Sequence, residues 1–193
     1  MLIEIGKIEA MFRYPVKSMA GERIESANLG WNGLEGDRRL AFRRVEDRSG
    51  FPWLTATKLP DLLLFTPIPT VDSAQRNPPT HVRTPDGKEL PVFGEELAKD
   101  VERRCGSAVQ MMHLRHGIFD DASISVIAMD TMCEIARQAG VSPDVRRFRP
   151  NILVRSLRSL PFQEDEWLGG VLSFGAEENA PMIAVTMRDA RCS

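Results

Sequence analysis

Cysteine is scarce in this sequence of 193 residues, and the cysteines that are present are far apart. Cys105, Cys133 and Cys192 have no close spacing, which argues against a disulfide framework and against a zinc knuckle. The iron–sulfur spacing C-x4-C-x2-C and a dinucleotide-binding glycine motif are also missing. An odd number of cysteines leaves at least one thiol unpaired within the chain. A free thiol fits a reducing compartment, or a cysteine that is kept for its chemistry.

The sequence also lacks long apolar runs and a large charge of one sign. No apolar stretch approaches the roughly 18 residues that a membrane helix needs. The formal net charge is -2, so the whole chain is no electrostatic match for nucleic acid. The first ten residues carry Glu4 and do not resemble a signal peptide. We therefore expect a cytoplasmic protein that binds neither membrane nor nucleic acid.

What the sequence does contain is a series of short strand patterns, mostly in its first half. Apolar residues alternate in the opening residues 3–12, where Gly6 suggests a bulge, and short strand candidates follow at 23–29, 40–45 and 62–66. The segments 81–84 and 88–92 flank Pro85-Asp86-Gly87, which is a typical hairpin turn. Further strands are expected at 152–155, 171–174 and 182–187. Many short strands and few helices indicate an α+β, predominantly β, β-barrel-rich fold.

Two helices interrupt the strands. Leu97, Val101 and Cys105 recur at four-residue intervals, so we predict a helix over 95–105 that stops at Gly106. A second helix is predicted over 131–139, with Asp130 as its N-cap and Gly140 just past its end. We place a domain boundary near Gly106, which gives an N-terminal β-barrel module at 1–106 and a core at 107–193.

Polar and cationic side chains collect where predicted strands end. These residues are Lys17, Ser18, Arg38, Arg149 and Asn151, and Arg191-Cys192 follows near the C-terminal end. Lysine and arginine donate to anions, and arginine grips phosphate with two parallel hydrogen bonds. Arg191 favours the thiolate of Cys192, and a thiolate is a soft ligand for a transition metal. Together they describe a site for a phosphorylated organic cofactor that carries a metal.

A simpler interpretation exists for each of these residues taken singly. Lysines and arginines at strand ends are usually solvated, and a cysteine next to a chain end is usually incidental. His81, His113 and His116 lack metal-site spacing and are expected to be structural or surface residues. Cys105 and Cys133 fall on the apolar faces of the predicted helices, so we expect both to be small core residues.

The order of the motifs favours the functional interpretation. The sequence reads YPVKS after the first strand, GDR about 20 residues later, FRPN after the second helix and RC near the end. LTA at 54–56, DASISVI at 121–127 and FQEDEW at 162–167 fall between them. In this order the motifs resemble the MOSC family in its two-part form, an N-terminal β-barrel module followed by the MOSC core. That form includes the mitochondrial amidoxime-reducing components and the C-terminal part of the molybdenum cofactor sulfurases.

The resemblance implies a molybdenum cofactor (molybdopterin), and it implies a role for each residue of the motifs. Lys17, Ser18 and Arg38 would contact its polar pterin and phosphate parts, while Arg149 and Asn151 would hold it from the core. Asp121 would lie near the metal with a catalytic role. Cys192, next to Arg191, would be the catalytic metal ligand on molybdenum, or would bear a persulfide in a carrier protein.

The implied function is a reductase of N-hydroxylated compounds that takes electrons from a separate flavin or iron–sulfur protein. The alternative is a sulfur carrier or a non-catalytic cofactor-binding module. Pyridoxal phosphate binding belongs to the fused sulfurases, and no lysine here argues for it independently. This chain stops where relatives continue with a Thr-rich strand, so we expect a core truncated at its C-terminal end and an open sheet edge that a homodimer would cover. Ala122 and Lys58 also depart from the family pattern.

Overall fold

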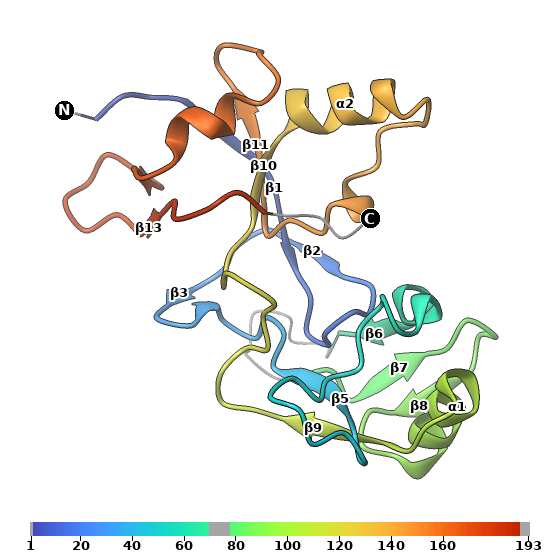
Figure 1. Ribbon diagram of the computed structural model, residues 1–193. Coiled ribbons are helices and arrows are strands. Elements are labelled where there is room, and N and C mark those ends of the chain that lie inside the picture. Colours follow the sequence, from blue (N-terminus) through green and yellow to red (C-terminus); the bar gives the residue numbers. More distant parts are fainter. Residues whose placement is uncertain (1, 70–77, 190–193) are drawn as a thin grey trace. The chain divides into compact units, whose positions relative to one another are not determined.

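The computed structural model describes residues 2–69 and 78–189, and the chain divides into two compact units (Figure 1). Unit 1 comprises Met1–Phe12 and Ile124–Ser193, and unit 2 comprises Arg13–Ser123. The domain boundary predicted near Gly106 stays a prediction, because the two units describe which residues pack together and do not define domain boundaries. Strands predominate, and α1 and α2 are the α-helices of the described residues, which confirms the α+β, predominantly β class. The sheets of these residues do not close into a barrel.

Unit 2 is built from short strands around one apolar core. Its elements are β2 (Glu22–Ile24), β3 (Leu29–Gly30), β4 (Gly33–Leu34), β5 (Leu40–Arg44), the 3-10 helix η1 (Pro60–Leu64), β6 (Thr66–Ile68), β7 (His81–Arg83), β8 (Glu89–Pro91), α1 (Glu95–Cys105) and β9 (Val109–His113). β5 pairs with β9, and β6, β7 and β8 form a three-stranded antiparallel sheet. The α1 helix packs against β8 and β9 (Figure 1). Phe65, Leu97 and Val101 are fully buried in the core between these elements.

Two predictions for unit 2 are confirmed. The helix spans the predicted residues, ends at Gly106 in the left-handed conformation with φ 72°, and buries Leu97 and Val101 while Cys105 is half-buried. The hairpin turn at Pro85-Asp86-Gly87 also forms, with Gly87 at φ 86°.

Two strand predictions for unit 2 are wrong. Residues 23–29 were expected to form one strand, but β2 ends at Ile24 and β3 starts at Leu29, so 25–28 belong to neither. Residues 62–66 were expected to form a buried strand, but 60–64 form η1 and the strand β6 starts at Thr66. Pro60 supplies the reason, since its fixed φ suits the first position of a helical turn. Residues 67–79 contain four prolines, a composition that predicts a loop. β6 extends into this segment as far as Ile68, and part of the segment lies outside the described residues.

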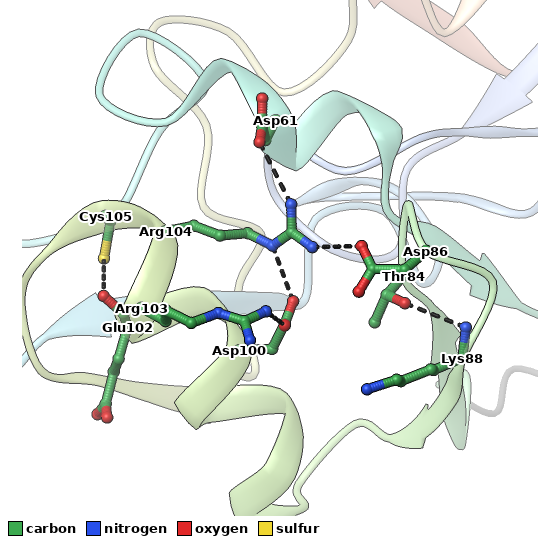
Figure 2. Close-up of polar contacts among 9 residues, drawn as sticks. All are labelled: Asp61, Thr84, Asp86, Lys88, Asp100, Glu102, Arg103, Arg104 and Cys105. Carbon is green, nitrogen blue, oxygen red and sulfur yellow. Dashed lines mark hydrogen bonds and ion pairs between the residues drawn. The ribbon is translucent and has the colours of Figure 1, made fainter.

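Arg104 ties three elements of unit 2 together (Figure 2). Its guanidinium donates to Asp100 at 2.9 Å on α1, to Asp86 at 2.6 Å in the β7–β8 turn and to Asp61 at 3.3 Å on η1. It also lies 5.4 Å from the centroid of the Phe65 ring. The hydrogen bond from Arg104 lowers the pKa of the Asp86 carboxyl below its ordinary value. One side chain thus connects elements that are 43 residues apart in the sequence.

We predict that Arg104→Ala destabilises the protein by about 2 kcal/mol, because charge-assisted hydrogen bonds and ring packing are lost together. Urea denaturation measures this change in the free energy of unfolding. Arg103→Ala is the control, since the Arg103 side chain is 68% exposed and pairs with the same Asp100. It should cost less than about 0.5 kcal/mol. Equal effects of the two substitutions would contradict the role given to Arg104.

Unit 1 is smaller and sheet-centred. Its elements are β1 (Gly6–Arg13, whose last residue lies in unit 2), β10 (Val126–Ala128), α2 (Met129–Gln138), the 3-10 helix η2 (Val145–Arg147), β11 (Ile152–Ser156), the 3-10 helix η3 (Gln163–Trp167), β12 (Val171–Ser173) and β13 (Met182–Ala184). β11 lies between β10, which runs parallel to it, and β1, which runs antiparallel. The β1 register shifts between Ile8 and Ala10, so the irregularity is not at Gly6. Gly6 instead approaches the Arg155 carbonyl so closely that a Cβ would lie 2.5 Å from its oxygen.

The start of α2 is stabilised from a distant part of unit 1. The helix begins at Met129 with Ala128 as N-cap, so the prediction that Asp130 is the cap is wrong. The Glu164 carboxylate on η3 accepts hydrogen bonds from the Ala128 N–H and the Thr131 hydroxyl, both at 2.6 Å. A carboxylate at a helix N-terminus satisfies backbone donors and complements the helix dipole. Cys133 on α2 is exposed, so its predicted place in the core is also wrong.

Removing the Glu164 carboxylate should therefore weaken unit 1. We expect Glu164→Ala to lower the free energy of unfolding by about 2 kcal/mol, since two hydrogen bonds to a charged group are lost. Glu166→Ala on the same 3-10 helix is the matched control, because Glu166 pairs with Arg158 where both side chains are about 60% exposed. Thermal unfolding of the two variants measures whether loss of Glu164 destabilises the protein more than loss of Glu166. A melting temperature that falls equally in both would show that the carboxylate is not a specific cap.

Candidate functional site

Backbone hydrogen bonds in unit 2 place two of the sequence motifs side by side. Arg38 N–H donates to the Tyr14 carbonyl at 2.7 Å, and Leu40 N–H donates to the Pro15 carbonyl at 3.1 Å. Lys17 N–H returns a bond to the Leu40 carbonyl at 2.7 Å. The segment that follows β1 is therefore fixed against the segment that enters β5. Lys17, Ser18 and Arg38, which we predicted to act together, lie in these two segments.

A third segment runs along the other edge of residues 38–40. Leu114 N–H donates to the Arg39 carbonyl and Ile118 N–H donates to the Arg38 carbonyl, each at 2.9 Å. The chain after β9 thereby reaches the same place as the first two segments. Residues 118–120 are the part that contacts Lys17 and Arg38.

Lys17 is buried, although a lysine at a strand end is usually solvated. Its side chain is only 3% exposed, and its ammonium donates to the Ile118 carbonyl at 3.2 Å and to the Asp120 carboxylate at 2.9 Å. The ammonium also lies 5.2 Å from the centroid of the Phe51 ring. Burying an ammonium is costly unless it is paired, and these contacts offset part of the cost of removing Lys17 from water.

Arg38 is held between aromatic rings and a buried carboxylate. Its guanidinium carbon lies 4.7 Å from the Tyr14 ring centroid and 5.9 Å from that of Phe119. One guanidinium nitrogen bonds the carboxylate of Asp37, which is fully buried. The other carboxylate oxygen of Asp37 accepts the Tyr14 N–H at 2.7 Å. These contacts fix the Arg38 side chain, which is 16% exposed.

Backbone conformation also marks the predicted site residues. Ser18, Arg38 and Arg149 have φ of 64°, 49° and 51°, in the left-handed region that L residues rarely adopt. Among the described residues other than glycine, Ser159 and Phe162 are the remaining examples. Strained backbone of this kind gathers at ligand and active sites. Arg149 precedes Pro150, which favours an extended backbone for the residue before it, yet Arg149 is left-handed.

Asn151 lies in unit 1, where its side chain has a structural role. It is 1% exposed, its amide donates to the Phe12 carbonyl, and its side-chain oxygen accepts the Ser125 N–H, both at 3.2 Å. The backbone of Asn151 also accepts the Phe12 N–H at 2.8 Å. The side chain therefore joins β1 to the segment before β10. Its role as a cofactor donor, like that of half-buried Arg149, stays a prediction.

The remaining predicted residues are exposed or lie outside the described part. Asp121 and Ala122 are exposed. Ser125 donates through its hydroxyl to the Asp189 carboxylate at 3.4 Å, within unit 1. Arg191 and Cys192 fall outside the described residues. In the ranges 2–69 and 78–189, no group of three or more His, Cys, Asp or Glu side chains could hold a metal ion.

Three residues that contact Lys17 or Arg38 had no role in the sequence analysis: Asp37, Phe119 and Asp120. Asp37 stands in the GDR motif, but nothing in the sequence shows that its carboxylate is buried between the Tyr14 N–H and Arg38. Phe119 and Asp120 directly precede the motif at 121–127, yet they reach Arg38 and Lys17 only because the chain folds back along residues 38–40. Contacts between residues about a hundred positions apart, such as Lys17 and Asp120, produce no local pattern in the sequence.

Lys17, Arg38 and Asp120 lie in the part of the chain that matches a known family. The model of the MOSC N-terminal beta barrel domain matches residues 5–122. The chain belongs to this family. Membership in the MOSC family associates the chain with binding of the molybdenum cofactor. No curated protein matches the sequence. In the part of the chain that the structure describes, no helix is long and apolar enough to cross a membrane.

Proposed function

We propose that this MOSC protein binds the molybdenum cofactor through its anionic phosphate and pterin groups, with Lys17, Ser18 and Arg38 as the unit 2 contacts. The observation that carries the proposal is the buried Lys17 ammonium, which hydrogen bonds fix in the segment next to Arg38. A protein has little reason to bury a lysine at a strand end for stability alone, because pairing rarely offsets the desolvation.

The donor set fits an anionic organic group. Lys17 offers a point charge, Arg38 a planar fork of donors and Ser18 a hydroxyl, which together suit phosphate oxygens. Arg38 is also fixed by two rings and Asp37, so little side-chain entropy is lost when it binds. Arg149 and Asn151 of unit 1 are proposed as further contacts.

The reaction that we propose is the two-electron reduction of N-hydroxylated substrates such as amidoximes. Substrate, two electrons and two protons yield the amidine and water, so the N–O bond is the bond that breaks. The cofactor supplies the redox chemistry when bound, and a separate flavin or iron–sulfur protein supplies the electrons. In this proposal Cys192 would be the protein ligand to molybdenum, Arg191 would favour its thiolate, and Asp121 would have a catalytic role beside the bound cofactor.

Turnover tests the reductase directly. Protein produced in a host that makes the cofactor is mixed with an aromatic amidoxime and chemically reduced viologen, and amidine is measured by chromatography. We expect amidine to form in proportion to the molybdenum content. Cofactor-loaded protein that forms no amidine would exclude the reductase and leave the sulfur carrier or the binding module.

A further inference from the structure

Lys17 and Arg38 are each paired with a carboxylate. Lys17 is paired with Asp120, and Arg38 is paired with Asp37, so two cations face two carboxylates within one group of unit 2. An anion that approached Lys17 or Arg38 with these pairs intact would meet a cation whose charge a carboxylate already balances. If the proposed anion-binding role of these cations is right, one carboxylate has to leave.

The two carboxylates differ in their freedom to leave. Asp37 is fully buried, bonds Arg38 and accepts the Tyr14 N–H, so its departure would expose several unsatisfied buried groups. The Asp120 side chain is 70% exposed, and its carboxylate accepts a 2.9 Å hydrogen bond from the Lys17 ammonium. Water can solvate Asp120 after a small rotation. The Ile118 carbonyl can keep its bond to Lys17 meanwhile.

We infer that Asp120 is a displaceable counter-ion, and that an anionic ligand takes its place beside Lys17. The carboxylate stabilises the buried ammonium when no ligand is present, and it opposes binding because the ligand has to compete with it. Asp120 thereby sets the affinity of the site for phosphate groups. This inference rests on the proposed function, since it assumes that Lys17 receives an anion.

The test uses inorganic phosphate as the probe and the full chain as the protein. Phosphorus NMR line widths are followed in a phosphate titration at constant low ionic strength. Asp120→Asn keeps an oxygen acceptor for Lys17 but removes the competing charge, so we expect it to bind phosphate about tenfold more tightly than the wild type. Glu89→Gln is the control, because it removes an exposed carboxylate of unit 2 that pairs with Arg83 and has no proposed role, and it should change affinity less than about twofold.

A double variant identifies the residue through which Asp120 acts. Combining Asp120→Asn with Lys17→Met should abolish the gain. The inference is overturned if Asp120→Asn gives no gain, if the gain survives without Lys17, or if Glu89→Gln gives an equal gain. Thermal melts establish that each variant is folded. The phosphate titration uses no molybdenum cofactor, so its result is independent of cofactor loading. A gain in phosphate affinity can be observed in protein that does not load the cofactor. Cofactor loading can likewise be measured if phosphate affinity does not change.

Discussion

Replacing Cys192 by serine is expected to lower amidoxime turnover at least about 100-fold. The reason is that a serine hydroxyl is a hard and mostly protonated ligand, whereas the proposed metal ligand is a soft thiolate. Even changes in the outer partners of metal ligands commonly cost 10–100-fold, so loss of the ligand itself should cost more. Turnover per mole of protein and molybdenum content per chain are the two quantities to measure.

Cys133→Ser is the control for this experiment, because Cys133 is an exposed cysteine on α2 and has no proposed role. It should leave turnover and molybdenum content unchanged. Full activity in Cys192→Ser would show that Cys192 is not the metal ligand. Mass spectrometry of the wild-type protein separates the alternative, since a persulfide adds one sulfur atom to the peptide that contains Cys192. That result would favour a sulfur carrier.

Replacing Lys17 by methionine is expected to weaken cofactor binding by about 2–3 kcal/mol, or roughly 30- to 150-fold. Methionine has a similar length and fills the buried space, but it cannot donate to an anion. The fold should survive, because a buried charge is removed together with its desolvation cost and the exposed Asp120 can be hydrated. The melting temperature should therefore stay the same or rise while cofactor retention falls.

Lys99→Met is the matched control for Lys17→Met. Lys99 lies on α1, its side chain is 71% exposed, and it pairs with Glu95 on the same helix. Cofactor retention in this variant should equal that of the wild type. A loss of retention in Lys17→Met that accompanies a large fall in melting temperature would instead assign Lys17 a structural role.

Local patterns in the sequence predicted the elements that depend on local physics. The four-residue spacing of Leu97, Val101 and Cys105 together with Gly106 predicted the bounds of α1, and Pro85-Asp86-Gly87 predicted the β7–β8 turn. Both depend on residues that are neighbours in the chain. The strand predicted over 62–66 failed because Pro60 starts a helical turn, a preference that outweighs a short apolar run.

Contacts between distant residues could not be predicted in the same way. The cap of α2 comes from Glu164, which lies 36 residues from the Ala128 N–H that it accepts. A search for local caps therefore selected Asp130. The motifs did identify Lys17 and Arg38, because their spacing resembles the family. Their burial and the partners Asp37, Phe119 and Asp120 depend on how three segments pair in unit 2.

The most direct test of the account is the cofactor content of the purified wild-type protein. The chain is produced with molybdate in a host that makes the cofactor, and molybdenum by mass spectrometry and pterin by fluorescence are measured per chain. The account predicts that both co-purify with the wild type and with Lys99→Met, in equal amounts, and that both are lost from Lys17→Met. Wild-type protein that carries neither molybdenum nor pterin, or Lys17→Met protein that carries as much as the wild type, would contradict it.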